Sequence, residues 1–269
     1  MRNLSITLMK NLNLSLLISI AAAIVLTSAT GCDRSAKAAA DGIMANMVRV
    51  DGGTFYMGND FSSYGGYEEE GPAHKVTLDP FYICKYEVTQ QEWEAIMGKN
   101  PSTYTDNGAK RPVETISWED CQVFVKWLSK LTGKHFRLPT EAEWEFAARG
   151  GNKSKGYRYS GANEVFEVAC VLNPGFKATQ EVGMLRPNEL GLYDMTGNVM
   201  EFCSDYYGGY SPKDQVNPKG ADSSADWSRV TRGGGWFSAD HNCHVTFRGS
   251  EQQKQRSNGV GLRVVMEAD

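Results

Sequence analysis

Residues 237–250 carry the mixture of side chains that a binding surface needs. Their sequence is Phe-Ser-Ala-Asp-His-Asn-Cys-His-Val-Thr-Phe-Arg-Gly-Ser. Aromatic, acidic, imidazole, amide and small side chains follow one another with no helical or strand periodicity, which is rare in a core segment. Binding surfaces combine stacking, charge and hydrogen bonding in this way. The pattern therefore predicts a binding surface here.

The residue types that usually carry catalysis or bind metals give a weaker signal. Five cysteines follow position 32, namely Cys84, Cys121, Cys170, Cys203 and Cys243. No two of them form a Cys-x-x-Cys pair, which argues against a zinc cluster, and an odd number leaves at least one thiol outside any internal disulfide. The four histidines are His74, His135, His241 and His244. None lies in a ligand or base motif, and no Ser-His-Asp arrangement for nucleophilic catalysis can be assigned.

Short strands and helices must position this segment. Apolar and β-branched runs bounded by glycine or proline predict strands at 47–50, 54–58, 75–78 and 81–88. After residue 150 the chain is rich in glycine and asparagine, which predicts many loops and few long elements. Helices in the first half with short strands throughout indicate an α+β fold.

Three helices are predicted from their capping residues. Thr89 and Thr140 each precede a glutamate by three residues, the spacing of a capping box. The clearest helix spans 117–132, where apolar residues recur at helical spacing, Ser117 caps the start and Gly133 ends the helix.

The overall composition excludes several classes of protein. Aromatic residues make up 11% and charged residues 22% of the 269 residues, so the chain can form a core and is not a disordered tail. The net charge is -4 with no basic stripe, which argues against a nucleic-acid partner. A mean hydropathy of -0.43 excludes a membrane protein with several spans.

Residues 1–31 have the composition of an export signal. Arg2 and Lys10 are followed by an apolar run and then by a cluster of small residues. A permanent transmembrane helix is the alternative, but the run is short and stops at the small residues. We therefore expect residues 1–31 to be a signal peptide and the protein to be exported.

The residues at the end of this signal indicate a lipid anchor. Ala29-Thr30-Gly31-Cys32 resembles the lipobox of bacterial lipoproteins, in which the cysteine becomes the lipidated first residue. A plain secretory signal is the alternative, because leucine is commonest where Ala29 stands. Cys32 is thus the predicted lipid anchor, residues 32–46 a tether, and the outer membrane or surface of a bacterium the expected location.

Motifs in a characteristic order run through residues 47–266. They include Gly52-Gly53-Thr54-Phe55, Tyr86-Glu87-Val88-Thr89, Arg137-Leu138-Pro139-Thr140-Glu141-Ala142-Glu143-Trp144, Gly191-Leu192-Tyr193-Asp194-Met195-Thr196-Gly197-Asn198, Arg232-Gly233-Gly234-Gly235-Trp236 and Gly261-Leu262-Arg263. By these motifs the chain resembles the formylglycine-generating enzyme (sulfatase-modifying factor) family. The resemblance implies a loop-rich, C-type-lectin-like fold of α+β class for residues 47–269, with a core that includes Trp118, Trp144 and Tyr193.

The resemblance also allows the family's oxidase chemistry to be checked. The active enzymes have two cysteines, two and seven residues after the aromatic residue of a Gly-Gly-Ser-aromatic turn, and their thiolates bind copper(I). Counted from Trp236, these positions are Ser238 and Cys243. A serine hydroxyl cannot replace a thiolate towards copper(I), so we expect the chain not to be an enzyme. Cys243 alone is interpreted as a small buried side chain.

A calcium site is the cofactor that the resemblance implies. In the enzymes, backbone carbonyls and a glutamate near a Gly-Asn-x-x-Glu turn hold calcium, and the matching positions are Thr196, Gly197, Val199 and Glu201. Hard oxygen ligands in a loop suit this ion. The alternative is that Glu201 stabilises the loop through hydrogen bonds without metal. No other cofactor is expected.

A second resemblance concerns the binding segment itself. Variable proteins of diversity-generating retroelements use the same fold, and the closest resemblance is to variable lipoproteins of the spirochaete type. Their C-terminal segment follows an Arg-Gly-Gly-Ser-Trp turn and is rewritten at template adenines, commonly in AAC codons. The resulting codons end in C and never encode Lys, Glu, Gln, Met or Trp. None of these five types occurs in residues 237–250.

The predicted function is therefore that of a surface-displayed lipoprotein, diversified by a retroelement, that binds a ligand through a variable segment near 236–265. The predicted contact residues are Phe237, Ser238, Ala239, Asp240, His241, Asn242, His244, Thr246, Phe247, Gly249 and Ser250. Cys243, Val245 and Arg248 are predicted scaffold positions. The expected partner is a protein or surface ligand of unknown identity, not nucleic acid. The alternatives are a formylglycine-generating-type oxidase and a structural cell-envelope protein of the same fold.

Overall fold

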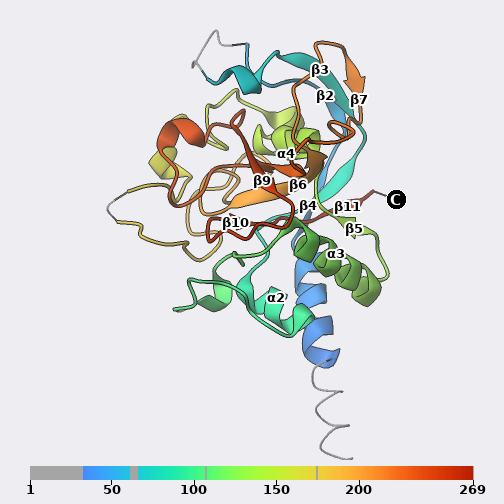
Figure 1. The fold of residues 1–269 in the computed structure, drawn as a ribbon, viewed down its shortest axis with the longest axis vertical. Coiled ribbons are helices and arrows are strands. Elements are labelled where there is room, and N and C mark those ends of the chain that lie inside the picture. Colours follow the sequence, from blue (N-terminus) through green and yellow to red (C-terminus); the bar gives the residue numbers. More distant parts are fainter. Residues whose placement is uncertain (1–32, 61–65, 107, 174, 269) are drawn as a thin grey trace, which may run out of the picture.

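Three small β-sheets and a few short helices make up the α+β fold (Figure 1). The computed structural model describes residues 33–60, 66–106, 108–173 and 175–268, and each structural statement refers to these residues. The predicted signal peptide and Cys32 lie outside them. Within them, no helix is both long and apolar enough to cross a membrane.

The first sheet joins the beginning and the end of the domain. Its order is β1 (Met47–Val50), β4 (Phe81–Cys84), β11 (Val265–Glu267) and β5 (Phe136–Arg137), and all neighbours are antiparallel. The predicted strand at 47–50 is confirmed. The strand predicted at 81–88 ends at Cys84, because the chain beyond it leaves the ladder and continues towards α2.

The second sheet carries the predicted binding segment. Its order is β10 (Val260–Gly261), β6 (Met200–Tyr206), β8 (Ser228–Arg232) and β9 (Arg248–Gln252), with β10 parallel to β6 and the other pairs antiparallel. Every residue of the central strand β8 is buried. Residues 233–247 connect β8 to its neighbour β9, so the segment is held at both ends by adjacent strands.

The third sheet consists of β2 (Gly53–Met57), β3 (His74–Leu78) and β7 (Gln215–Val216) and lies at the far end of the molecule from a helix of residues 33–45 (Figure 1). Its strands β2 and β3 confirm the predictions for 54–58 and 75–78.

All three predicted helices are present with their predicted caps. They are α2 (Gln90–Met97), α3 (Trp118–Thr132) and α4 (Glu141–Ala148). Thr89, Ser117 and Thr140 each accept a hydrogen bond from the third helical residue and complete a capping box. The left-handed φ of 71° at Gly133 ends α3 at the predicted glycine. The described residues also form five 3₁₀ turns: η1 (Glu68–Glu70), η2 (Gly108–Lys110), η3 (Gly151–Lys153), η4 (Val165–Glu167) and η5 (Asp240–Asn242).

Two large apolar clusters form the core, one around α3 and one around α4. In the first, the rings of Trp93 and Phe124 stack at 5.0 Å with an interplanar angle of 4°. In the second, Trp144 is completely buried, as predicted. Trp118 and Tyr193 are only half-buried and lie at the edge of the core rather than within it.

The predicted tether is wrong for residues 33–45, which form a helix (Figure 1). Ala40 and Ile43 are both fully buried and belong to the apolar cluster around α3. With Ala36 they recur at the spacing of one helical face, and the alanine-rich sequence favours a helix. A segment rich in small side chains resembles a flexible linker in composition. Here the small side chains allow the helix to pack closely against the cluster around α3. The folded domain therefore includes residues 33–45, before the predicted start at residue 47.

Candidate functional site

A glycine turn starts the segment between β8 and β9. Gly233 and Gly234 have φ of 93° and 70°, in the left-handed region that favours glycine. A Cβ atom on Gly234 would lie 2.4 Å from the Cys243 sulfur, so this glycine is also required for space. The chain then passes through η5 before entering β9. The close contact between the two ends of the loop makes it compact.

Four of the predicted contact residues are exposed. Phe237 is 41% exposed, and Asp240, His241 and Ser250 are also exposed. The Phe237 ring lies over Gly259, where a Cβ would approach it to 2.0 Å, and meets Trp236 edge to face at 5.7 Å. Both contacts fix the position of the Phe237 ring.

Five more predicted contact residues are half-buried: Ala239, Asn242, Thr246, Phe247 and Gly249. Several of these pack against residues 67–70. The Tyr67 hydroxyl donates to Asn242 Oδ1 at 2.8 Å, and the Tyr67 ring lies 5.9 Å from that of Phe247. The Thr246 hydroxyl donates to Glu70 Oε2 at 2.7 Å. Residues 67–70 therefore support the segment from one side.

Ser238 and His244 do not present contact side chains, contrary to the prediction. Ser238 is 7% exposed, and its hydroxyl accepts from Gly235 N at 3.0 Å, which closes the turn. His244 is 4% exposed, and its Nε2 accepts from Arg158 Nε at 2.7 Å. Burial and the Arg158 guanidinium lower the pKa of His244 to about 4, so the ring is neutral at pH 7. Because the segment has no regular period, its sequence cannot show which of its side chains turn inward.

The three predicted scaffold residues, Cys243, Val245 and Arg248, are buried. Arg248 donates to both oxygens of Glu141, at 2.6 and 2.8 Å, and so ties β9 to the start of α4. A bidentate charge-assisted pair of this kind has a defined geometry. The contact residues therefore project from a fixed backbone.

The two positions that resemble the copper-binding cysteines lie side by side: the Ser238 hydroxyl adjoins the Cys243 thiol, whose sulfur donates to the Ala239 carbonyl at 3.4 Å. Burial and nearby Asp240 raise the pKa of the Cys243 thiol to about 12. One protonated thiol and one hydroxyl do not fit copper(I), which is bound by thiolates. Ser238 and Cys243 occupy the positions of the family's two copper-binding cysteines, but they do not supply two thiolates. All five cysteines in the described part of the chain are free.

Of the residues predicted for calcium, Thr196, Gly197 and Val199 lie just before β6 and Glu201 lies within it, but this carboxylate is already engaged. Glu201 is completely buried and accepts from Arg263 Nη2 and Trp144 Nε1, both at 2.7 Å. A buried guanidinium therefore stands where a cation would bind Glu201. Two other carboxylates, Glu87 and Asp194, lie near it, and burial raises the pKa of both, that of Asp194 to about 6. No His, Cys, Asp and Glu group of three or more in the described ranges is arranged to hold a metal ion.

Several residues of this surface carry no local sequence signal. The Tyr104 ring meets Trp236 edge to face at 5.3 Å, and Asn258 Nδ2 donates to the Tyr104 hydroxyl at 3.0 Å. Leu172 is 61% exposed, and its amide donates to the Ser238 carbonyl at 2.9 Å. These residues lie far from one another in the sequence, so only the folded chain brings them to the segment.

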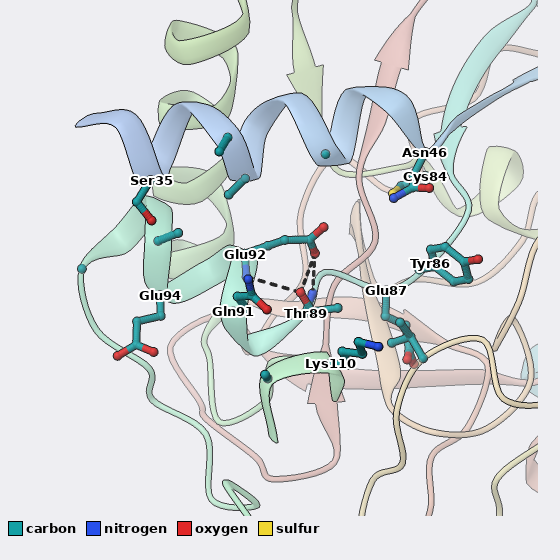
Figure 2. Close-up of a pocket in the computed structure, with 17 residues that line it drawn as sticks. Ser35, Asn46, Cys84, Tyr86, Glu87, Thr89, Gln91, Glu92, Glu94 and Lys110 are labelled. Carbon is teal, nitrogen blue, oxygen red and sulfur yellow. Dashed lines mark hydrogen bonds between the residues drawn. The ribbon is translucent and has the colours of Figure 1, made fainter. Parts of the chain in front are cut away.

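A cavity of about 960 Å³ lies elsewhere, between the helix of residues 33–45 and α2 (Figure 2). It is lined by Cys84, Glu87, Glu92 and Lys110 together with small residues of both helices. Glu92 faces it, but its Oε2 accepts from Thr89 N and Oγ1, both at 2.8 Å, and serves to cap α2. No predicted contact residue lines this cavity.

Comparison with known proteins agrees with the fold and with both resemblances. The family model described as "Sulfatase-modifying factor enzyme 1-like domain" matches residues 33–268. The chain is 32% identical over 270 residues to "Chaperone protein LppX" of Paenibacillus barcinonensis, covering 82% of this chain and 89% of that protein. It is 30% identical over 293 residues to the formylglycine-generating enzyme of Streptomyces coelicolor, covering 82% of this chain and 89% of the enzyme.

A solved structure of "Treponema denticola variable protein 1" has the same fold. The two structures align with a TM-score of 0.74 at 27% identity, over 82% of this chain and 95% of that chain. The predicted α+β, C-type-lectin-like fold of the formylglycine-generating type is thereby confirmed. The similar proteins include both an enzyme and proteins that are not named as enzymes. Similarity alone therefore does not assign an activity to this chain, and the residues of the site must be considered.

Proposed function

The chain belongs to the sulfatase-modifying factor family, and we propose that it is a non-catalytic member of that family that binds a ligand at the cell surface. One observation carries the proposal. The segment between β8 and β9 exposes Phe237, Asp240 and His241, while Cys243 and Val245 in the same segment, and Arg248 at the start of β9, are buried. A backbone held in this way limits the entropy lost on binding and tolerates changes of the exposed side chains.

The donor atoms at positions 238 and 243 support the proposal that the chain has no oxidase activity. An oxidase that uses copper(I) needs two thiolates, and this pair of positions offers the Ser238 hydroxyl and the protonated Cys243 thiol. The similarity to a variable protein and to a protein named as a chaperone supports a binding role. The oxidase reading would be favoured if purified protein bound copper(I) tightly and oxidised a cysteine-containing sulfatase peptide.

Lipid anchoring at Cys32 and diversification by a retroelement complete the proposal. Cys32 immediately precedes the helix of residues 33–45, which packs against the core. An acyl chain at Cys32 would hold the domain close to the membrane without a long flexible linker. Metabolic labelling with a fatty acid should label the wild-type protein and not the Cys32→Ser variant.

The nucleotide sequence provides the experiment for diversification. We expect a non-coding near-copy of the codons for residues 237–250, which differs almost only at adenines, beside a reverse transcriptase gene. If no such copy exists in the genome, the segment is a fixed binding loop, and the retroelement part of the proposal is wrong.

Ligand binding itself is tested with the exposed residues. Bacteria that carry a triple alanine variant should no longer adhere to the surface to which cells with the wild-type protein adhere. The substitutions are Phe237→Ala, Asp240→Ala and His241→Ala, and they remove the exposed ring and charge. Unchanged adhesion would favour a structural role in the envelope.

A further inference from the structure

A small pocket of about 130 Å³ is lined by residues of the second and third sheets and by the start of α4. Met57 and His74 come from β2 and β3 of the third sheet, and Asp205 comes from β6 of the second. Glu141 is the first residue of α4. The pocket is smaller than those that enclose drug-sized ligands, so it suits one side chain or one small molecule.

The floor of the pocket is buried, whereas glycines form its opening. Met57, His74 and Asp205 are each 3% exposed. Gly209 and Gly220 also line the pocket, and both are exposed. The pocket therefore leads from the surface to polar groups that are shielded from bulk water, where an electrostatic contact is stronger than at the surface.

Two charged side chains of the floor, Glu141 and Arg248, compensate each other through their bidentate pair. Glu141 also accepts from the Tyr210 hydroxyl at 2.9 Å. The remaining Arg248 nitrogen, Nη1, donates to the Glu69 carbonyl at 2.9 Å. Both side chains thus have their partners within the protein, and neither requires a ligand.

Asp205, in contrast, keeps one carboxylate oxygen free. Its Oδ2 accepts from the Ser204 hydroxyl at 2.8 Å and from Glu141 N at 3.1 Å, and neither donor is a cation. Its Oδ1 accepts no hydrogen bond from the residues that the structure describes. Oδ1 is not among the fully enclosed polar atoms without a partner, so it is reached from the pocket.

Gly220 leaves the space beside this oxygen. Its φ of 77° lies in the left-handed region that favours glycine. A Cβ atom on Gly220 would lie 2.8 Å from Asp205 Oδ1. The glycine is therefore required both by its backbone conformation and by the access that it gives to Oδ1.

His74 supplies a second acceptor. Its Nδ1 lies 3.1 Å from the Pro72 carbonyl, which can only accept, so Nδ1 carries a hydrogen. In the uncharged ring Nε2 is then left with a lone pair. Within the described ranges Nε2 has no hydrogen-bond partner, and like Asp205 Oδ1 it is not fully enclosed. The Tyr210 ring packs against the imidazole at 4.9 Å.

The free polar atoms of the floor indicate what would enter the pocket. Both are acceptors, and burial together with nearby Glu141 raises the pKa of Asp205 to about 7, because the site disfavours a second negative charge. A cation with N–H donors would complement these atoms. Since the described residues include no group of three or more metal-ligating side chains, an ammonium group fits better than a metal ion. Met57 and Ala142 offer apolar surface to an alkyl chain.

We propose that this pocket binds a primary alkylammonium group, from a lysine side chain or a small aliphatic amine, which donates hydrogen bonds to Asp205 Oδ1 and His74 Nε2. The site goes beyond the proposed function, because neither Phe237 nor His241 of the exposed loop lines the pocket. Only Arg248, at the start of β9, is shared with the segment of residues 237–250.

The test uses the full-length protein with n-butylammonium as the probe and calorimetry at pH 8.5. At this pH Asp205 is ionised, while an alkylammonium group, with an ordinary pKa of about 10.4, keeps its charge. We expect one saturable site. n-Butanol has the same alkyl chain without the charge, and tetramethylammonium has the charge without N–H donors. Both should bind at least about tenfold more weakly.

The proposal is overturned if n-butylammonium shows no saturable binding, or if n-butanol or tetramethylammonium binds equally well. Asp205→Asn keeps the size of the side chain and removes its charge, and it should weaken n-butylammonium binding about tenfold or more. If this variant does not fold, the comparison of the three probes decides.

The matched control is Asp41→Asn. This residue lies on the helix of residues 33–45, at the other end of the molecule from the third sheet, and its side chain is 58% exposed (Figure 1). The variant loses the same charge away from the pocket and should bind n-butylammonium within about twofold of wild type, because a distant exposed charge is screened. An equal loss of affinity in the two variants would contradict the role of Asp205.

Nα-Acetyl-lysine methylamide distinguishes the two sources of the ammonium group. Tighter binding than that of n-butylammonium supports a lysine side chain as the ligand, and weaker binding supports a small amine. The triple variant of Phe237, Asp240 and His241 separates this site from the proposed function. It should bind n-butylammonium as wild type does, whether or not adhesion is lost, and a loss of this binding would contradict the assigned pocket.

Discussion

Arg248 and Glu141 form a buried, bidentate ion pair that joins β9 to α4, with contacts of 2.6 and 2.8 Å. The two side chains are 2% and 3% exposed. The Arg248 guanidinium also lies 3.9 Å from the centre of the Tyr210 ring, whose hydroxyl donates to Glu141 at 2.9 Å. This cluster fixes the point where the exposed segment ends.

Removal of one partner of this pair should destabilise the protein strongly. Arg248→Met leaves the Glu141 carboxylate buried with only part of its charge compensated by Arg232, and we expect a loss of about 3–5 kcal/mol in the free energy of unfolding. Urea denaturation measures it. The control Arg256→Met breaks the ion pair with Asp120, whose side chains are 52% and 28% exposed, and should cost less than about 1 kcal/mol. Equal effects of the two variants would contradict the structural role of Arg248.

A single substitution should restore the missing thiol of the copper-binding pair. In Ser238→Cys the new sulfur would lie beside that of Cys243, because the serine hydroxyl already contacts it. We expect this variant to bind one copper(I) ion with far higher affinity than wild type, since two soft sulfur donors, which lose their protons on binding, replace one thiol and one hydroxyl. Competition with a chromophoric copper(I) chelator measures the affinity. Ser238→Ala is the control, and tight binding by the wild-type protein would show that the present pair suffices.

The helix of residues 33–45 should contribute to folding. Ile43 is fully buried in the cluster around α3, so Ile43→Ala should lower the free energy of unfolding by about 2–5 kcal/mol. Lys37→Ala removes an exposed ion pair with Asp41 from the same helix and should change stability by less than about 1 kcal/mol. If Ile43→Ala is as stable as wild type in urea, the segment acts as a tether after all.

Stability should depend on pH through Asp205. Burial, with Glu141 nearby, raises the pKa of Asp205 from 3.8 to about 7. Between pH 4 and 7 the folded state then holds a proton that the unfolded state has released, so this group's contribution to stability falls as pH rises through that window. Asp205→Asn should flatten this fall and be more stable than wild type at pH 8, by a few kcal/mol at most.

Thermal unfolding across the pH range measures this effect. Asp214→Asn, a change of a side chain that is 74% exposed, should keep the wild-type pH dependence. If stability falls more steeply with rising pH in the Asp205→Asn variant than in the wild-type protein, Asp205 is ionised and stabilising in the folded state.

Local physical signals explain why many elements could be predicted. Capping boxes at Thr89, Ser117 and Thr140 depend on residues three positions apart, so sequence alone locates the starts of α2, α3 and α4. The family motifs likewise identified the fold, since their order along the chain is distinctive. The first helix was missed because its burial depends on a distant partner surface around α3.

The sequence by itself determined the fold class, the helix starts, the missing thiol at position 238 and the composition of the segment before β9. Only the tertiary structure decided which members of that segment face outward, that Ser238 and His244 are buried, and that Arg263 holds Glu201. The physical reason is that a loop has no fixed period. In a strand or helix the period tells which side chains share a face, whereas in this loop each side chain's direction depends on contacts with residues such as Arg158 and Leu172, which are distant in the chain.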